Sequence, residues 1–238
     1  MKRILLFVVL LTSLLSSCGD EEITRDPDSL GYQYYPLAIG NYWIFNVTEN
    51  KYTLNVITQT TTYQSRERID GTITDQTGRE WYRVELSRRS NPEASWVVSG
   101  VKLISMSSSD LRIQENNQTF VKMVFPVKKG YSFVTNGFVD AVTYDYVYLT
   151  YSDLGKTIFE NGTTYDNTLT VIQEDFEKLY DLREQSEILS FNLGPIKRSL
   201  VSFDYCNTSD VGICEVGTGF IVNGTEKIEV LESSGKTE

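Results

Sequence analysis

The chain has 238 residues, which is enough for one domain with a full hydrophobic core or for two small domains. Its formal net charge of −10 disfavours nucleic acid and anionic lipid headgroups as partners, because both would repel it. The absence of histidine excludes Ser-His-Asp and Cys-His nucleophiles, histidine-ligated zinc and imidazole bases, so an enzyme would need paired carboxylates or a Lys or Tyr base.

The first 17 residues have the pattern of an export signal. Lys2 and Arg3 precede an apolar run, 4–15, that is too short to span a bilayer, and small residues lead into Cys18. This pattern resembles the bacterial lipoprotein signal, which implies that residues 1–17 are removed and that Cys18 carries acyl chains as the first residue. A plain secretory signal with an incidental cysteine is the alternative.

An acidic run follows the expected anchor. Asp20-Glu21-Glu22 resembles the surface-export signal of Bacteroidota lipoproteins, which implies an outer-membrane protein on the cell surface. An acidic linker without export function is the alternative, and it would leave the periplasmic leaflet open. The charged and turn-forming residues 18–31 are expected to form a lipidated, flexible tether.

The folded domain is expected to cover residues 32–238. It opens with the aromatic stretch 34–45, in which Pro36 favours extended backbone and Gly40-Asn41 supplies a turn. This stretch resembles the Tyr-Pro-Leu-x-x-Gly-Asn-x-Trp opening of an uncharacterised Bacteroidota envelope lipoprotein family, and the stretch 191–197 resembles a late segment of the same families. The resemblance implies a fold and not a site. Trp43, Trp81 and Trp96 are expected to belong to the core.

The middle of the chain alternates with period two. Tyr82, Val84 and Leu86 fall on one face of a strand, with Arg83 and Glu85 on the other. Frequent turn dipeptides separate such runs, and two of them, Asn161-Gly162 and Asn223-Gly224, are predicted to form two-residue hairpins. The window 173–183 could form a short helix or a charged loop between strand ends.

These patterns predict an all-β fold. We expect a single antiparallel meander domain of ten or more strands, curled as an open barrel or half-barrel, with at most one short helix.

Cys206 and Cys214 remain as a pair after Cys18 takes the lipid. They flank a turn-rich loop in a disulfide-permissive compartment, so we expect a disulfide that contributes about 2–3 kcal/mol. A redox-active pair is the alternative, although the Cys-x-x-Cys spacing is missing.

A tyrosine ladder is the candidate ligand contact. Tyr144, Tyr146 and Tyr148 share one face of a strand and could stack on sugar rings or on a peptide. An ordinary amphipathic sheet face explains the same pattern.

Acidic residues are the remaining candidates for chemistry. Carboxylates that could pair for glycoside hydrolysis have no spacing that singles out two of them: Asp140, Asp145, Asp153, Glu174 and Asp175. No calcium-binding pattern is present, so no metal and no cofactor are expected.

The sequence therefore predicts a lipoprotein anchored in the membrane through lipid. We expect a non-catalytic binding or structural component of the envelope, with a glycan, a lipid or an envelope protein as partner. A small carboxylate-dependent glycan hydrolase is the alternative, and two close carboxylates in an aromatic cleft would favour it.

Overall fold

The computed structural model describes residues 27–139, 146–173, 179–208 and 214–237. These residues form two short 3-10 turns and twelve strands: η1 (Pro27–Leu30), η2 (Tyr32–Tyr34), β1 (Asn41–Thr53), β2 (Val56–Thr74), β3 (Glu80–Arg89), β4 (Val97–Met106), β5 (Asp110–Glu115), β6 (Gln118–Val124), β7 (Ser132–Val134), β8 (Tyr148–Glu160), β9 (Thr163–Gln173), β10 (Asp181–Ser190), β11 (Gly194–Tyr205) and β12 (Ile221–Lys236).

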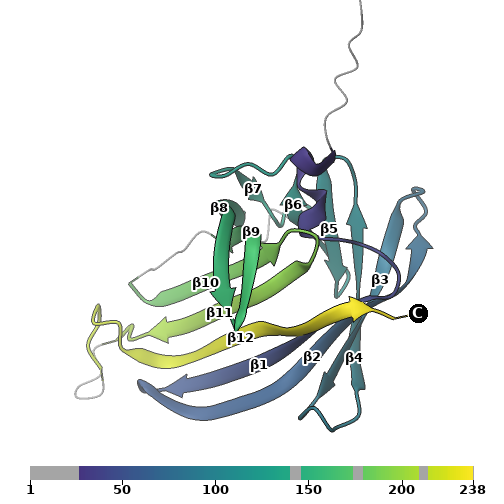
Figure 1. Ribbon diagram of the computed structural model, residues 1–238. Coiled ribbons are helices and arrows are strands. Elements are labelled where there is room, and N and C mark those ends of the chain that lie inside the picture. Colours follow the sequence, from purple (N-terminus) through teal and green to yellow (C-terminus); the bar gives the residue numbers. More distant parts are fainter. Residues whose placement is uncertain (1–26, 140–145, 174–178, 209–213, 238) are drawn as a thin grey trace, which may run out of the picture.

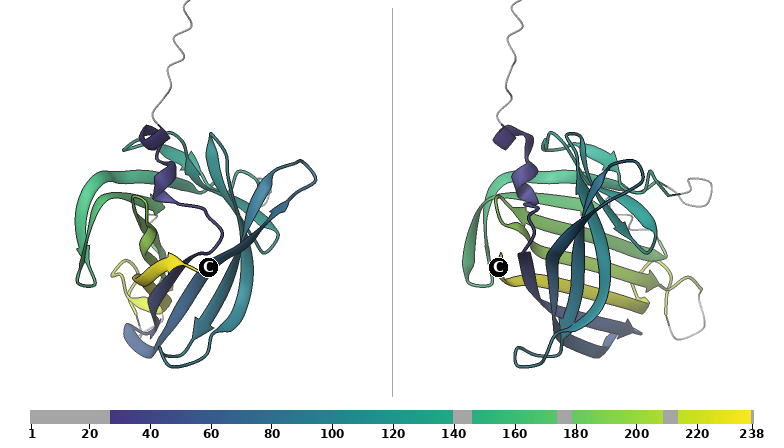
Figure 2. Two further views of the ribbon diagram at one scale, coloured as in Figure 1. Left: turned by 45° about the vertical axis from the view of Figure 1, so that its right-hand side comes forward. Right: turned by 90° about the vertical axis from the view of Figure 1, so that its right-hand side faces the viewer.

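All twelve strands belong to one antiparallel sheet. Its order is β6-β5-β4-β3-β2-β1-β12-β11-β10-β9-β8-β7, so two consecutive meanders join where β1 pairs with β12. Figure 1 shows the sheet curling around an interior, and the views in Figure 2 show the curl from other sides. The predicted all-β fold, a single antiparallel sheet curled as an open barrel, is confirmed.

The two outer edges of the sheet approach each other. The Val121 amide on β6 donates to the Thr135 carbonyl just after β7 at 2.7 Å, and the Thr135 hydroxyl donates to the Val121 carbonyl at 2.8 Å. The Tyr151 hydroxyl on β8 donates to the Val124 carbonyl at 2.9 Å and accepts from the Val124 amide at 2.7 Å. These contacts nearly close the barrel at its seam.

The segment before β1, which contains η1 and η2, lies at one end of the curled sheet (Figure 1). Tyr34 and Tyr35 are buried, and the Gln33 carbonyl accepts a hydrogen bond from the Asn192 amide at 2.9 Å. The apolar core lies on the inner face of the sheet behind these residues, and its fully buried members include Phe45, Ile69, Tyr151, Leu169, Leu189 and Ile196.

Gly40 connects the two ends of the domain. It adopts a positive φ of 91°, and its carbonyl accepts hydrogen bonds from the amide and hydroxyl of Thr237. A Cβ at this position would lie 2.4 Å from the Thr237 carbonyl oxygen. The turn predicted at Gly40-Asn41 is present, and glycine is required there for space as well as for φ.

The two predicted hairpins have different outcomes. Asn161 and Gly162 connect β8 to β9 with φ angles of 48° and 78°, as a type I′ hairpin requires. Asn223-Gly224 is not a hairpin, because β12 runs straight through it. Gly224 lies between Tyr52 on β1 and Phe203 on β11, whose rings meet edge to face with their centres 5.0 Å apart. A Cβ at Gly224 would lie 2.4 Å from the Phe203 ring, so the glycine makes room for the two rings rather than a turn.

No α-helix occurs among the described residues. In the window 173–183, β9 ends at Gln173, Leu179 and Tyr180 form a turn, and β10 begins at Asp181. Trp43 and Trp81 are buried as expected, and Trp96 is half-buried between the guanidinium groups of Arg66 and Arg89.

Candidate functional site

Charged side chains occupy inward positions next to apolar core residues of the same strands. Arg198 on β11 lies two residues after Ile196, which is fully buried in the core, and Glu187 on β10 lies two residues before Leu189. Glu67 on β2 precedes the buried Ile69 by the same interval, and Glu229 on β12 precedes Leu231. Successive residues of a strand point to opposite faces, so these four side chains face the same interior as the core.

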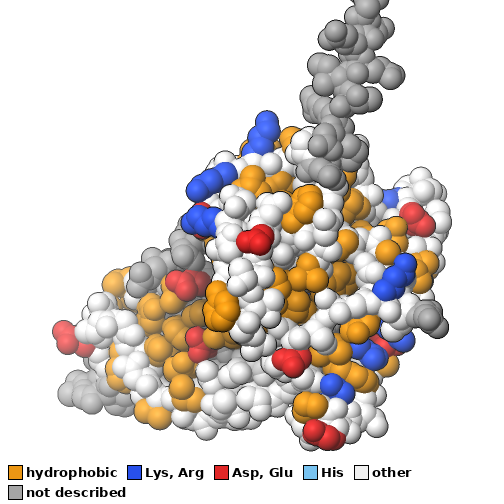
Figure 3. Space-filling model, viewed as in Figure 1, with side chains coloured by type: hydrophobic (Ala, Val, Ile, Leu, Met, Phe, Trp, Pro, Cys, Tyr) orange, Lys and Arg blue, Asp and Glu red, His pale blue; other side chains and the backbone are white. Residues whose placement is uncertain are grey.

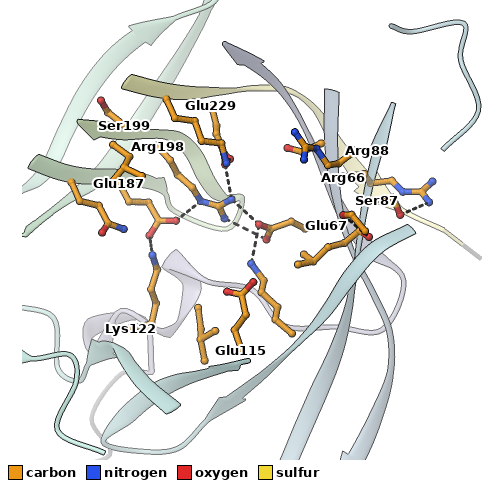
Figure 4. Close-up of a pocket in the computed structure, with 18 of the residues that line it drawn as sticks. Arg66, Glu67, Ser87, Arg88, Glu115, Lys122, Glu187, Arg198, Ser199 and Glu229 are labelled. Carbon is orange, nitrogen blue, oxygen red and sulfur yellow. Dashed lines mark hydrogen bonds and ion pairs between the residues drawn. The ribbon is translucent and has the colours of Figure 1, made fainter. Parts of the chain in front are cut away.

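Arg198 is the centre of the resulting ion-pair network (Figure 4). Its guanidinium contacts Glu67 at 2.7 and 3.3 Å, Glu187 at 2.8 Å and Glu229 at 3.1 Å. It also lies over the Phe45 ring, 4.7 Å from the ring centre. One arginine therefore holds three buried carboxylates from three strands.

Three lysines complete the network. Lys102 on β4 pairs with Glu67 at 2.8 Å, and Lys227 on β12 pairs with Glu229 at 2.6 Å. Lys122 on β6 pairs with Glu187. The network thus connects strands near one edge of the sheet, β4 and β6, with β10 and β11 on the other half.

Burial and pairing act in opposite directions on the carboxylates. Burial alone would raise the pKa of Glu67, but the charges and hydrogen bonds of Arg198 and Lys102 outweigh it and hold that pKa far below its ordinary value. Burial would also raise the pKa of Glu187, but the charges of Lys122 and Arg198 outweigh it and lower that pKa. The pKa of Glu229 is lowered in the same way by Arg198 and Lys227. All three groups are carboxylates at neutral pH.

Tyr35, in the segment before β1, lies next to this network. Its side chain is fully buried, and its hydroxyl proton has no acceptor among the described residues, while the Arg198 guanidinium lies near its oxygen as a donor. Burial and the nearby negative charge of Glu67 raise its pKa well above the ordinary value, so the phenol keeps its proton. It is a buried donor without an acceptor, and such groups usually have a partner.

The network forms one side of a cavity of about 590 Å³. Its remaining wall combines apolar and aromatic groups, among them Tyr63, Leu86, Ile113 and Leu200, with Ser65. Leu200 is half-exposed, with 44% of its surface accessible, at an inward position of β11. The volume is in the range of small-molecule sites.

A second hollow of about 740 Å³ is also lined by Tyr35. It is lined by Tyr32, Leu37, Tyr82 and Met106 together with Arg79. The Arg79 guanidinium is occupied by Asp110 at 2.9 Å and by the Ser105 hydroxyl at 2.9 Å. This hollow therefore offers aromatic surface but no free charge at Arg79.

The two described tyrosines of the ladder are not part of the cavity wall. Tyr146 and Tyr148 are exposed, with 55% and 38% of their surfaces accessible, and neither lines the 590 Å³ cavity. Tyr144 lies outside the described residues. The ladder remains a prediction as a ligand contact.

The structure also places the predicted disulfide cysteines and one of the candidate carboxylates. Cys206 and Cys214 form the expected disulfide. Asp153 is at the surface, paired with Lys156 at 2.8 Å and Lys129 at 3.3 Å. The residues outside the described part of the chain are Cys18, Asp140, Asp145, Glu174 and Asp175.

Among the described residues, no group of three or more His, Cys, Asp or Glu side chains could hold a metal ion. In the same part of the chain, no helix is both long and apolar enough to cross a membrane.

The sequence patterns did not predict the ion-pair network. The available signal was a charged residue in phase with apolar neighbours, as in Ile196-Lys197-Arg198-Ser199-Leu200, where Arg198 shares a face with Ile196 and Leu200. The acidic residues that the sequence offered as candidates lie in one part of the chain, 140–175, whereas Glu67, Glu187 and Glu229 are brought together by strand pairing and curl.

Comparison with known proteins gives little further guidance. No protein-family model and no curated protein matches the chain. The structure is similar to that of a Bacteroides fragilis protein described as exported, with a YmcC-like fold, at a TM-score of 0.42, and to that of a Parabacteroides distasonis protein described as a lipoprotein, at 0.39. Each similarity has 9% sequence identity and covers 85% of this chain and 98% of the other chain.

Proposed function

We propose that this chain is a lipid-anchored, non-catalytic envelope protein that holds a small ligand inside its barrel. The observation that carries the proposal is the 590 Å³ cavity, with a fixed ion-pair network on one side and apolar and aromatic groups on the other. Small-molecule sites combine apolar walls with a few oriented polar groups in this way.

The orphan hydroxyl of Tyr35 supports a ligand in this cavity rather than a purely structural network. A buried donor without an acceptor costs about 1–3 kcal/mol, so an acceptor supplied by a ligand would stabilise this site. Tyr35 is fully buried beside Arg198, and a ligand acceptor would satisfy its hydroxyl.

The glycan hydrolase alternative is weakened by the state of the carboxylates. Glycoside hydrolysis needs one protonated carboxyl with a raised pKa beside one carboxylate. Glu67, Glu187 and Glu229 all have lowered pKa values and share Arg198, so none is a proton donor at neutral pH. Binding without chemistry fits these groups better.

The lipid anchor and the cell-surface location in this proposal are supported by sequence motifs. The lipobox before Cys18 supports lipidation, and Asp20-Glu21-Glu22 supports export to the outer face of the outer membrane. Protease treatment of intact cells tests the location: digestion from outside is expected, and protection until lysis would place the protein on the periplasmic side.

Native mass spectrometry tests the binding site. The lipidated protein, extracted from its own outer membrane in mild detergent, is expected to release a non-covalent mass on activation. Ser65→Trp, which fills the cavity from β2, is expected to abolish that mass, whereas Ser90→Trp, on an exposed residue between β3 and β4, retains it. If both variants retained the non-covalent mass equally, the cavity would be excluded as the binding site.

A further inference from the structure

The charge of the cavity wall differs in sign from that of the whole protein. The wall contains six cationic side chains and four carboxylates, whereas the chain has a net charge of −10. Arg66, one of the six, is paired with Glu85 outside the wall at 3.2 Å. Five cations therefore face four carboxylates in a strongly acidic protein.

The carboxylates of the network are already shared. Glu67, Glu187 and Glu229 each contact Arg198 and one lysine, so four cations are held by three carboxylates. The fourth carboxylate of the wall, Glu115, and one of its cations, Arg88, are both exposed to solvent, where their charges are screened. The buried part of the wall keeps an excess of positive charge.

Arg88 adds a cation that no carboxylate neutralises. Its guanidinium stacks on the Tyr63 ring, 3.9 Å from the ring centre, and forms no ion pair within the described part of the chain. Both residues line the cavity, and Lys227 lines it as well. Stacking fixes the plane of the guanidinium and leaves its edge N–H groups available to a ligand.

The hydrogen-bonding groups that the wall leaves available to a ligand are mostly donors. Arg88, Lys227 and the protonated Tyr35 phenol are all donors, and Lys227 keeps two N–H groups besides the one that faces Glu229. The nearby carboxylate acceptors are engaged by Arg198 and the lysines. A ligand that supplies negative charge and acceptor oxygens complements this wall, and a cationic ligand does not.

Building on the proposed function, we propose that the cavity binds a small organic oxyanion, with its carboxylate, sulfate or phosphate group held by Arg88 and Lys227. The cavity volume of about 590 Å³ accommodates a ligand of the size of a sugar acid. The polar remainder of such a ligand would face Ser65 and the Tyr35 hydroxyl, which both line the same cavity.

A size-matched panel of sugars tests this inference by isothermal titration calorimetry at millimolar concentration and low salt. The probes are glucose, glucuronate, glucose 6-sulfate, glucose 6-phosphate and glucosamine. At least one anionic sugar is expected to bind about tenfold or more tightly than glucose, with affinity that falls as salt rises. Preference for glucuronate would assign a carboxylate ligand, and preference for the sulfate or phosphate ester would assign that group.

Matched variants locate the interaction. Arg88→Gln and Lys227→Gln each remove one cation from the wall and are expected to weaken binding of the preferred anion about threefold or more. Lys51→Gln removes the same charge from an exposed position outside the wall and is expected to leave affinity unchanged. Circular dichroism spectra and melting temperatures confirm that each variant is folded.

Failure of the oxyanion inference and failure of the proposed ligand-binding function give different results. Equal affinity for glucose and the anionic sugars, or tighter binding of glucosamine, would overturn the oxyanion inference and leave a ligand-binding cavity in place. Binding of none of the five probes, together with a native mass spectrum free of ligand, would overturn the proposed function as well. A preference for anions that Lys51→Gln reduces as much as Lys227→Gln would show a long-range charge effect and reject the cavity as its origin.

Discussion

Arg198 on β11 and Glu67 on β2 form an ion pair through two nitrogen–oxygen contacts of 2.7 and 3.3 Å, although β12 and β1 lie between their strands in the sheet. The pair therefore crosses the interior of the curled sheet instead of following its hydrogen-bond ladder (Figure 4). It connects β2 with β11 across the interior beside the cavity, which both residues line.

Removing Arg198 is expected to destabilise the protein strongly. Arg198→Met leaves three buried carboxylates with one lysine each, and breaking a buried ion pair from one side costs about 3–5 kcal/mol. Urea unfolding of the variant measures the loss. Arg83→Met is the control: Arg83 pairs with Asp70 at 2.8 Å but its side chain is 50% exposed, so its loss is about 1 kcal/mol or less. Equal losses in the two variants would contradict a structural role for the network.

Acid is expected to weaken the fold through the same glutamates. Their folded-state pKa values are lowered, so their contribution is fully present above the unfolded value of about 4.3 and is lost as pH falls toward the folded values. The free energy of unfolding should be nearly constant from pH 7 to about pH 5 and then decrease. Glu67→Gln should flatten this decrease, whereas Glu93→Gln, at an exposed position between β3 and β4 and outside the cavity, should leave it unchanged. A decrease in stability that is unchanged in Glu67→Gln would show that other groups cause it.

Gly194 is expected to tolerate no side chain. It has a φ of 97°, and a Cβ would lie 2.9 Å from Nε1 of Trp43, which donates to the Leu193 carbonyl at 2.6 Å. Gly194→Ala combines backbone strain with this clash and should lower the melting temperature. Gly162→Ala is the matched control, since Gly162 has a φ of 78° but nothing within 4 Å of its Cβ position. A smaller loss for Gly194→Ala than for Gly162→Ala would exclude the close approach to Trp43 as a constraint.

Tyr151 is expected to secure the seam of the barrel. Its hydroxyl serves both the amide and the carbonyl of Val124, so Tyr151→Phe leaves two backbone groups without that partner and should cost about 1–3 kcal/mol. Hydrogen exchange at the Val124 amide should accelerate selectively. Tyr148→Phe on the same strand, where the side chain is exposed, should change neither quantity. Unchanged exchange in Tyr151→Phe would show that the seam is held by other contacts.

The face of the molecule seen in Figure 3 has exposed hydrophobic side chains. Hydrophobic side chains gather over β10 and β11 and beside the β8–β9 hairpin on the face seen in Figure 3, with charged side chains scattered among them. The tip of that hairpin reaches β11, where Glu160 pairs with Lys197 at 2.8 Å. Exposed apolar side chains are common on folded proteins, so the interior remains the better candidate.

The sequence was a good guide to local structure. Alternation around Val84 correctly placed one face of β3 in the core, and Asn161-Gly162 correctly gave a hairpin, because both signals depend on neighbouring residues alone. Asn223-Gly224 was misread since its glycine is explained by Tyr52 and Phe203, which are distant in sequence.

The site could not be predicted for the same reason. Arg198 and Glu67 are separated by 131 residues, and only the curl of the sheet brings them together. Alternation shows that Arg198 shares a face with Ile196, but it does not show which carboxylates meet it there. Prediction of the site requires the order of the strands and their curvature, which local patterns do not supply.

The central claim is that the ligand site is the interior cavity and not the tyrosine ladder. Titration of the ¹⁵N-labelled protein with glucuronate, followed by amide chemical shifts, tests it most directly. The proposal predicts shifts at Ser65, Leu200 and Lys227, which line the cavity on β2, β11 and β12. Shifts confined to Tyr146 and Tyr148, with the amides of the cavity wall unchanged, would contradict it and return the site to the exposed tyrosines.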